Sequence, residues 1–242
     1  LTEDEGQRLC TCLDEAEELI ERGEFEWKME DEDIHMNLER FMTEKLGELG
    51  KKIHLGRSRN DLIATTLRLS ICSEIDIASY FLRNCILAIR DVSFKWLDII
   101  TPGMIHMQFG QPIRFGHLFS AHGHALKRDL KRMEQAQDEA LEYMPLGASA
   151  FAGTHVSIDF EKLAEDLQFA APALHSYDAV SDRDYILSAL SSYATLAMHL
   201  SRLCEDVMYW SSSGIKVLQL PYDWSTGRSI MPNKRNRDIP EL

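Results

Sequence analysis

Two long stretches of this chain contain neither glycine nor proline, and no other feature limits its fold as strongly. One runs from Arg57 to Thr101 and the other from Ser181 to Ser213. Glycine and proline are the residues that weaken or break helices. At 1.5 Å per residue, the first stretch alone is long enough for a helix of roughly 60 Å. A third long helix is predicted from Phe115 to Met144. We therefore expect an all-α fold built on long helices.

Shorter helices are predicted near the start of the chain. Thr2 and Glu5 form a T-x-x-E capping box, and Gly23 is a natural stop for the helix that follows. Apolar residues at helical spacing mark a second helix over residues 34–46, which Gly47 ends. No segment combines strand-like alternation with hairpin turn residues, so no sheet is expected.

Helices of this length need packing partners along their whole extent, and a compact core of one chain does not supply them. We therefore expect a long-helix bundle that is extended by oligomerisation. Residues 57–242 are interpreted as the central bundle domain and residues 1–56 as an N-terminal helical lobe. A row of small and apolar residues fits either a subunit interface or an ordinary core stripe, and the pattern does not separate the two. The row contains Leu187, Leu190, Ala194, Ala197, Ser201 and Cys204.

The charge balance limits the partners. The net charge is −13, which argues against nucleic acid and anionic membranes. Two segments are locally basic against this background. One contains Arg57 and Arg59, and the other contains Lys234, Arg235 and Arg237. They would suit a small anionic substrate, although solvated loop tips have the same composition.

Cysteine usage and the start of the chain bear on the compartment. The five cysteines are scattered and odd in number, which favours a reducing compartment over a disulfide framework. The acidic start has no signal-peptide pattern, and no apolar run reaches membrane-spanning length. We therefore expect a cytoplasmic protein.

Three segments carry recognisable motifs. Residues 225–236 read S-T-G-R-S-I-M-P-N-K-R-N and resemble the G-S-S-x-M-P-x-K-x-N signature of the fumarase/aspartase superfamily of lyases. Residues 56–61 (G-R-S-R-N-D) and 101–112 (T-P-G-M-I-H-M-Q-F-G-Q-P) narrow the resemblance to argininosuccinate lyase. The match covers essentially the whole chain. Family members extend further at both ends, so the helical bundle is expected to be incomplete as given.

The resemblance implies a function in arginine biosynthesis. Argininosuccinate lyases are carbon–nitrogen lyases that convert argininosuccinate, a small anion, to L-arginine and fumarate. They need no metal or other cofactor, and they are homotetramers whose active sites combine loops of three subunits. A base removes a proton beside a carboxylate, and fixed donors stabilise the resulting aci-carboxylate. By resemblance, Lys234 and Asn236 supply those donors.

His106 is the second catalytic position that the resemblance implies. Taken alone, a histidine is more often a surface residue or a satisfied core residue. The x-H-x-Q-x-x-Q-P context identifies His106 with the acid–base histidine of the family. In that family a glutamate, here at the position of Glu241, holds the histidine ring in place. A carboxylate on one ring nitrogen fixes the tautomer and raises the basicity of the other.

Further positions resemble substrate contacts. The planar guanidinium of Arg59 presents a fork of N–H donors that fits the two oxygens of a carboxylate. Ser58 and Asn60 would also cap a long helix, and the two roles are compatible. The segment 145–154 matches a family loop, but a plain helix connector explains it equally well. The substrate-binding set is Ser58, Arg59, Asn60, Ile105, Gln108, Arg183, Ser229 and Asn236.

Three residues depart from the family pattern. Arg228 stands where the family has its serine base, Ile105 replaces a threonine before the histidine, and Arg237 replaces a proline. Arginine stays protonated near neutral pH, so it accepts no proton. We therefore expect impaired activity. A non-enzymatic member like the delta crystallins is one alternative. Another fumarate-releasing lyase of the superfamily is the other, although the G-R-S-R-N-D segment argues against it.

The remaining histidines and cysteines carry no predicted metal site. His122 and His124 are two residues apart, and such residues point apart on a helix. Together with His117, they are interpreted as surface residues. Cys10 and Cys12 have no second ligand pair, so no zinc site is expected.

Overall fold

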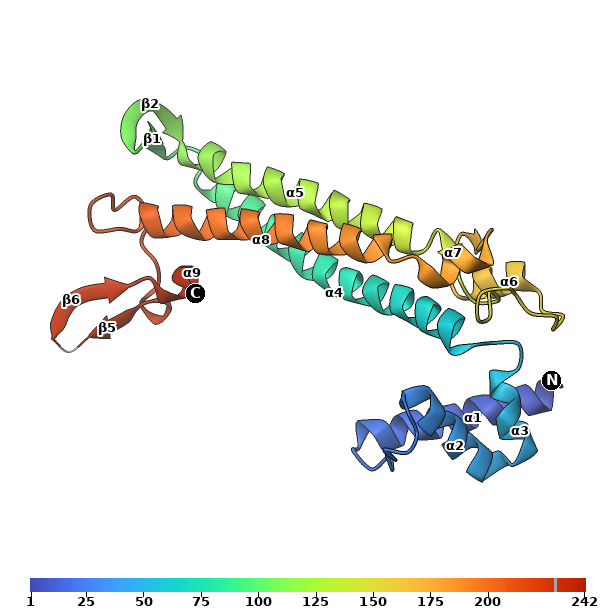
Figure 1. Cartoon of the computed structure of the whole chain (residues 1–242). Coiled ribbons are helices and arrows are strands. Elements are labelled where there is room, and N and C mark those ends of the chain that lie inside the picture. Colours follow the sequence, from blue (N-terminus) through green and yellow to red (C-terminus); the bar gives the residue numbers. More distant parts are fainter. Residues whose placement is uncertain (229) are drawn as a thin grey trace. The chain divides into compact units, whose positions relative to one another are not determined.

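Three long helices dominate the computed structural model, which describes residues 1–228 and 230–242 (Figure 1). They are α4 (Arg59–Lys95), α5 (Phe115–Ala140) and α8 (Asp184–Trp210). The predicted long-helix, mainly α fold is confirmed. The shorter helices are α1 (Glu3–Glu21), α2 (Ile34–Leu46), α3 (Glu48–Lys51), η1 (Lys52–His54), α6 (Phe160–Asp166), α7 (Ser176–Ser181), η2 (Tyr222–Trp224) and α9 (Asp238–Glu241).

The predicted signals set the ends of the first two helices. The Thr2 hydroxyl accepts the Glu5 backbone N–H at 3.2 Å, and the Glu5 carboxylate accepts the Thr2 N–H at 2.9 Å. This is the expected capping box of α1. Gly47, with φ of 61°, follows the end of α2. Each long helix is shorter than predicted, because the residues that flank it enter turns or strands.

The expectation that no sheet forms was wrong. Strands β1 (Ile100–Ile105) and β2 (Gln108–Arg114) make an antiparallel hairpin, as do β5 (Thr226–Arg228) and β6 (Met231–Asn236). A short parallel pair joins β3 (Tyr143–Met144) to β4 (Ala171–Pro172). Proline is accepted in the first hairpin because both strands of a two-stranded sheet are edges. The His106–Met107 turn lacks the usual Asn-Gly signal, so this hairpin was not predicted.

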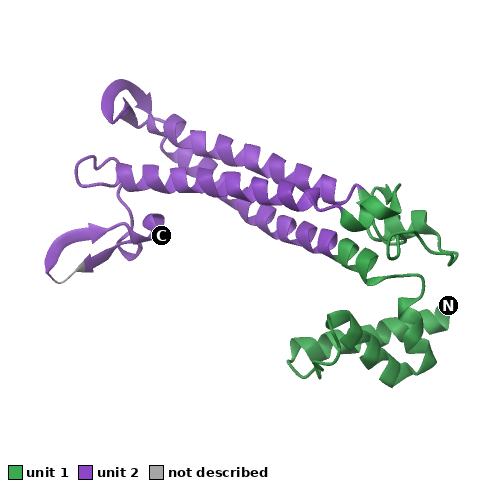
Figure 2. Cartoon of the chain, viewed as in Figure 1, with its two compact units in different colours: residues 1–66, 143–181 green, residues 67–142, 182–242 purple. Residues whose placement is uncertain are grey.

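The chain forms two compact units (Figure 2). Unit 1 contains residues 1–66 and 143–181, and unit 2 contains residues 67–142 and 182–242. The division falls within α4. The predicted domain boundary between residues 56 and 57 stays a prediction.

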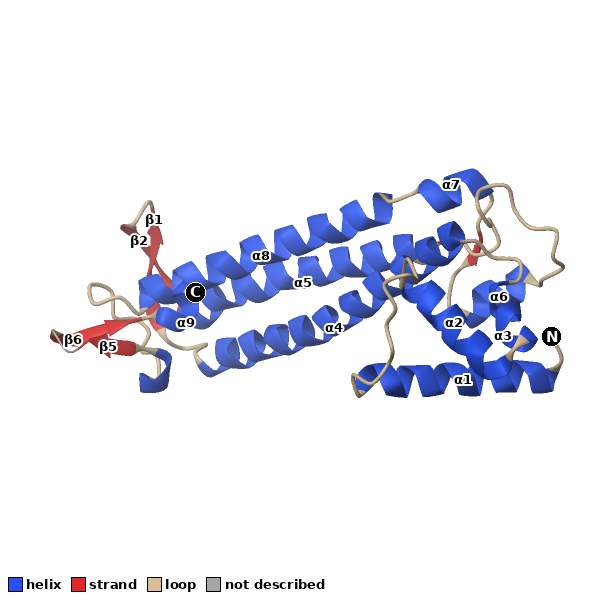
Figure 3. Ribbon diagram, turned by 60° about the horizontal axis from the view of Figure 1, so that its bottom comes forward, coloured by secondary structure: helices blue, strands red, loops and turns tan. Residues whose placement is uncertain are grey.

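Unit 2 has its core where the three long helices meet. Helices α5 and α8 pack side by side (Figure 3), and α4 adds its apolar face. Trp210 packs edge-on against Phe115, which stacks on Phe119. The buried residues of this core are Ile75, Leu82, Ile89, Phe115, Phe119, Leu126, Met133, Ala136, Ala189 and Trp210.

A buried carboxylate with two polar partners lies between α5 and α8. Asp129 of α5 is fully buried, and its carboxylate lies 2.7 Å from His199 Nδ1 on α8. Arg132 donates to the other Asp129 oxygen at 2.8 Å. A buried carboxylate without partners would be costly, so this pair restricts how α5 and α8 can be aligned.

The row of small residues on α8 lies outside the core. Leu187 is 65% exposed and Leu190 59% exposed, and Ala194, Ala197 and Ser201 are also exposed. The core side of α8 is instead formed by residues such as Ala189. Most of the row is therefore not part of the core that the described residues form.

We expect Gly116→Ala to destabilise the protein, because the α5 backbone lies close to the C-terminal end of α4 there. A Cβ atom at Gly116 would lie 2.2 Å from the Ser93 carbonyl oxygen and 3.0 Å from Leu97 Cα. Overpacking of this kind costs about 1–3 kcal/mol. Gly6→Ala in α1 is the matched control, since no atom lies within 4 Å of its added Cβ. It should stabilise by about 0.5–1 kcal/mol. Urea unfolding measures both, and equal stabilities would contradict the close approach.

Candidate active site

His106 lies at the tip of the β1–β2 hairpin. His106 and Met107 connect the strands with φ values of 50° and 58°. Two consecutive positive φ values define a type I′ turn, which residues with side chains adopt at a cost of about 1–2 kcal/mol each. Strain of this kind is often found where a side chain must be presented for function. Ile105 and Gln108 pair directly below the turn, and both are exposed.

The base of the hairpin is anchored to the long helices. The Phe115 N–H donates to the Ile99 carbonyl at 2.7 Å, and the Tyr209 hydroxyl donates to Met104 Sδ at 3.2 Å. A cavity of about 580 Å³ lies here, lined by both Met104 and Met107 of the hairpin and by Tyr209 and Trp210 of α8. The hairpin is therefore held at its base by the Phe115 N–H and nearer its tip by the Tyr209 hydroxyl.

His122, on α5, contacts two residues of α8 in this region. His122 Nε2 lies 3.0 Å from Asp206 Oδ2 on α8, and the His122 ring packs against Trp210. The His122 side chain is only 12% exposed, so its interpretation as a surface histidine was wrong. His122 lies on the side of α5 that faces α8. His117 and His124 are exposed as predicted.

The signature segment forms the β5–β6 hairpin. Lys234 and Asn236 are two residues apart on β6, a spacing that puts side chains on the same face of a regular strand. The register with β5 is irregular next to them, because Arg235 pairs with Gly227 and Met231 pairs with Arg228. Lys234 is exposed and Asn236 is half-buried. Arg228 ends β5, but its side chain is outside the described structure. Ser229 lies outside the described residues.

Arg237 and Glu241 follow the signature strand. The Arg237 guanidinium donates to the Ser211 carbonyl at 2.9 Å, which ties the end of β6 to the end of α8. Glu241 is exposed at the end of α9. Within the described part of this single chain, no hydrogen bond or ion pair joins Glu241 to His106. Their predicted contact stays a prediction for the assembled oligomer.

Arg59 is held between two carboxylates of unit 1. Its Nε lies 3.0 Å from Asp33 Oδ2, and its Nη1 donates to Glu39 Oε1 at 2.7 Å. His54 Nδ1 lies 3.1 Å from the same Glu39 oxygen. The motif analysis missed Asp33, Glu39 and His54. Local spacing did not reveal them, because the carboxylates come from α2 and the loop before it.

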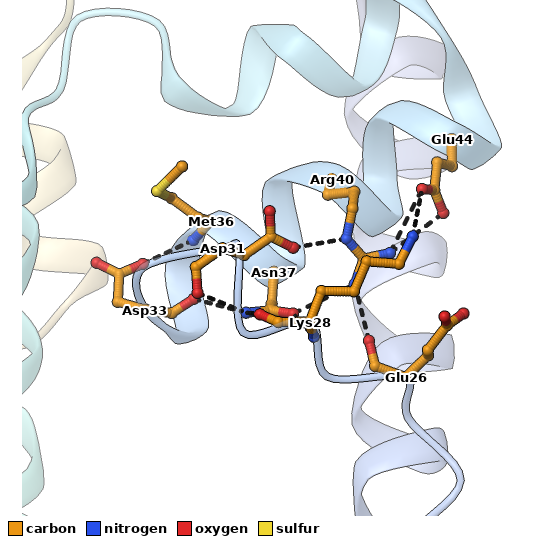
Figure 4. A network of polar contacts seen from close by, with 8 residues as sticks. All are labelled: Glu26, Lys28, Asp31, Asp33, Met36, Asn37, Arg40 and Glu44. Carbon is orange, nitrogen blue, oxygen red and sulfur yellow. Dashed lines mark hydrogen bonds and ion pairs between the residues drawn. The ribbon is translucent and has the colours of Figure 1, made fainter.

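A polar network fixes the loop that carries Asp33 (Figure 4). The buried Asn37 accepts the Lys28 N–H at 2.8 Å and donates to the Asp33 carbonyl at 3.0 Å. Arg40 bonds the Asp31 carboxylate at 2.6 Å and the Glu26 carbonyl at 2.7 Å. The Asp33 carboxylate also caps α2 through the Met36 N–H at 2.7 Å. Asp33 is thus held rigidly opposite Arg59.

Ser58 and Asn60 perform structural roles beside any contact with a ligand. The Ser58 hydroxyl accepts the Asn60 N–H at 3.3 Å, which is the predicted capping role. Asn60 Nδ2 donates to the Ala150 carbonyl at 2.9 Å. A cavity of about 370 Å³ in unit 1 is lined by the preceding Gly56 and Arg57, and Ser58, Arg59 and Asn60 do not line it.

Arg183 directly precedes α8 and is exposed. Its neighbour Asp182 accepts the Asp184 N–H at 2.8 Å and forms an ion pair with the buried Arg68. The Arg68 guanidinium lies over the Tyr185 ring at 4.1 Å. A buried cation therefore fixes the backbone on which Arg183 is presented.

Several other kinds of site find no support in the described residues. No three His, Cys, Asp or Glu side chains among them gather closely enough to hold a metal ion. The five cysteines are unpaired, and burial raises the pKa of the Cys72 thiol to about 11. None of the described helices has both the length and the apolar character needed to span a bilayer.

Comparisons with known proteins agree on one group. A family model described as "Lyase" matches residues 1–242. The argininosuccinate lyase of Hahella chejuensis is 45% identical over 242 residues, which are 100% of this chain and 52% of that protein. The enzyme of the same name from Chromohalobacter salexigens is 43% identical over 242 residues, again 100% of this chain and 52% of that protein. The chain spans about half the length of these curated relatives.

A solved structure supports the fold independently. The crystal structure of EDDS lyase in complex with formate superimposes with a TM-score of 0.86 and 25% sequence identity. The match covers 100% of this chain and 47% of that one. The long-helix architecture is therefore the same in both.

We expect the stability of unit 1 to fall as the pH drops through about 6.5, in part because His35 takes up a proton on unfolding. Burial lowers the pKa of His35, and the nearby Asp33 carboxylate opposes this effect. The unfolded chain, with a histidine pKa of about 6.5, then binds more protons than the folded one, so stability is lost below that pH. His35→Gln should flatten the pH dependence of urea unfolding between about pH 7.5 and 5.5. The matched change at exposed His124 is the control. An unchanged pH dependence in His35→Gln would count against this assignment.

Proposed function

Because the chain belongs to the lyase family, we propose that this protein is an argininosuccinate lyase homologue. The reaction is the elimination of a small anion, argininosuccinate, to L-arginine and fumarate, a step of arginine biosynthesis. The observation that carries the proposal is the 45% identity to an argininosuccinate lyase across all 242 residues. The identity includes the region of all three motifs, which argues against another lyase of the superfamily. Incubation with argininosuccinate, adenylosuccinate and malate, followed by fumarate measurement, tests the proposal.

The two hairpins carry the proposed catalytic groups. Lys234 and Asn236, two residues apart on β6, are proposed to donate to the same substrate carboxylate, one as a cation and the other as a neutral donor. Stabilising the aci-carboxylate is usually the largest single contribution to such a reaction. His106 is presented at a strained, exposed turn, which suits acid–base exchange with a substrate. Glu241 is proposed to orient its ring within the oligomer.

The first group of proposed substrate contacts lies in unit 1. Arg59, Ser58 and Asn60 lie at the start of α4, and Asp33 and Glu39 fix the Arg59 side chain. The two carboxylates already offset the charge of Arg59. Arg59 is therefore proposed to bind the substrate through the guanidinium N–H groups that these carboxylates do not occupy. The remaining contacts are assigned to Ile105, Gln108, Arg183 and Ser229.

Assembly is the other part of the proposal. We propose a homotetramer with composite active sites, located in the cytoplasm. Its support is the apolar surface of two long helices, which is exposed in the described part of the chain. On α4 this surface includes Tyr80, Phe81 and Phe94, and on α8 it includes Leu187 and Leu190; all are at least 59% exposed.

A non-enzymatic role is the second candidate, and position 228 is the observation that favours it. Arginine cannot take the substrate proton, since it remains charged at neutral pH. Its bulk, where a small serine fits, would also obstruct closure of the loop over the substrate, and its charge would pair with the substrate carboxylate or Glu241. Ser229 is a poor replacement, because a one-residue step along the chain redirects the side chain. Residual binding of an anion remains compatible with the loss of catalysis.

We expect Arg228→Ser to raise fumarate production from argininosuccinate in the full-length protein. Loss of a positioned base typically costs about a hundredfold to ten-thousandfold, so the gain should reach at least about a hundredfold. Steady-state turnover measures it. Near-normal turnover with Arg228 in place would contradict the assignment of the missing base. If the serine brings no gain, Ile105→Thr and Arg237→Pro are the next changes to test.

We expect the full-length protein to be an oligomer, most simply a tetramer, at micromolar concentration. The reason is the exposed apolar surface of α4 and α8 described above. Light scattering coupled to size-exclusion chromatography measures the mass. Leu187→Glu combined with Leu190→Glu should dissociate the assembly, whereas Glu165→Lys on α6 is the control. A clean monomer of the unchanged protein would refute the assembly.

A further inference from the structure

Asp61 is a fully buried carboxylate in the first turn of α4. Its Oδ1 accepts the Ser58 backbone N–H at 2.8 Å. Its Oδ2 accepts two more backbone N–H groups, from Gly147 at 3.0 Å and from Ser149 at 2.8 Å. Hydrogen bonds to an ionised carboxylate are roughly twice as strong as those between neutral groups. The three bonds join two segments that are far apart in sequence.

Helix capping explains only half of this arrangement. Ser58 and Asp61 have the spacing of a capping box, in which the third helical residue accepts the N–H of the cap residue. That role requires Oδ1 alone. The second oxygen points to a different segment of unit 1, so Asp61 must do more than end a helix.

The segment that Asp61 reaches has the geometry of an anion-binding nest. Gly147 and Ser149 have φ values of 111° and 55°, and both direct their N–H groups to one oxygen. Successive N–H groups in such conformations form concave sites for anions. A Cβ atom at Gly147 would lie 2.5 Å from the Phe160 ring, so the loop is also tightly packed. Here the anion in the nest is the Asp61 side chain.

The neighbours of Asp61 depend on the same contact. Asn60 donates to the Ala150 carbonyl at 2.9 Å, one residue beyond the nest. On the other side of the loop, Ser176 donates to the Phe151 carbonyl at 2.7 Å. If the nest opened, Asn60 would lose its acceptor, and Asp61 would lose two of the three donors that hold its carboxylate beside the Ser58 N–H.

We propose that Asp61 is a positioning residue for substrate binding: by filling the nest at residues 147–149, it fixes Ser58 and Asn60 in their binding geometry. The 145–153 loop then supports the substrate-binding residues and is more than a plain helix connector. This inference rests on the proposed function for the role of Ser58 and Asn60. The contact between the carboxylate and the loop does not depend on it.

The test compares Asp61→Asn and Asp61→Glu in the full-length protein. Asparagine keeps the shape, but it loses the charge and replaces one acceptor oxygen by a donor. Glutamate keeps the charge and moves the carboxylate by one methylene. Asp129→Asn is the matched control, because Asp129 is equally buried but bonds His199 and Arg132 instead of the loop.

Two measurements are made on each variant: hydrogen exchange of peptides covering residues 145–153, and argininosuccinate affinity by calorimetry. Asp61→Asn should speed exchange of the loop and weaken affinity by at least about tenfold each. Asp61→Glu should give smaller changes in the same direction. Asp129→Asn should lower the melting temperature while it leaves loop exchange and affinity within about twofold.

Each outcome decides a separate point. Unchanged loop exchange in a folded Asp61→Asn protein would overturn the proposal. Faster exchange with unchanged affinity would overturn the positioning role. If Asp61→Asn does not fold, parental exchange and affinity in Asp61→Glu would overturn the proposal, because the placement of the carboxylate would then be irrelevant. If the parent protein binds no argininosuccinate, the proposed function fails, and loop exchange alone still decides the contact.

Discussion

The burial of the long helices against one another is the constraint on which the rest of the structure depends. Helices α4, α5 and α8 contribute to one apolar core, and Gly116 allows α5 to approach the α4 backbone closely. Helices packed in this way have no free backbone groups along their length. The residues with exposed and chemically useful side chains therefore lie at the helix ends and on the hairpins between them. Every candidate catalytic residue in the described chain follows this rule.

Buried charges determine how those ends are arranged. Asp61, Arg68 and Asp129 all lie on long helices, and all are at most 5% exposed. Burying a charge is costly unless partners offset it, so each of these side chains strongly disfavours arrangements that remove its partners. Asp129 aligns two helices. Asp61 and Arg68 instead bind loop segments, which places Asn60 and Arg183 on fixed backbones.

The candidate site was predictable only where the chemistry is local. The capping box at Thr2 and the cap at Ser58 both follow from spacing within a few residues. The hairpin at His106 was missed because its turn uses two residues that rarely adopt positive φ values. Asp33 and Glu39 were missed because the partners of Arg59 are 20 or more residues away in the sequence. Contacts at such separations leave no periodic signal.

The sequence by itself determined the long helices, the mainly helical fold and the likeness to argininosuccinate lyase. These follow from the absence of helix breakers and from three motifs, both of which are properties of neighbouring residues. Only the tertiary structure decided that the α8 row faces outward, that His122 faces inward to Asp206, and that Asp61 fills the loop at residues 147–149. The physical reason is that burial and partner choice depend on which segments meet. That is settled by the packing of the entire unit and not by local preference.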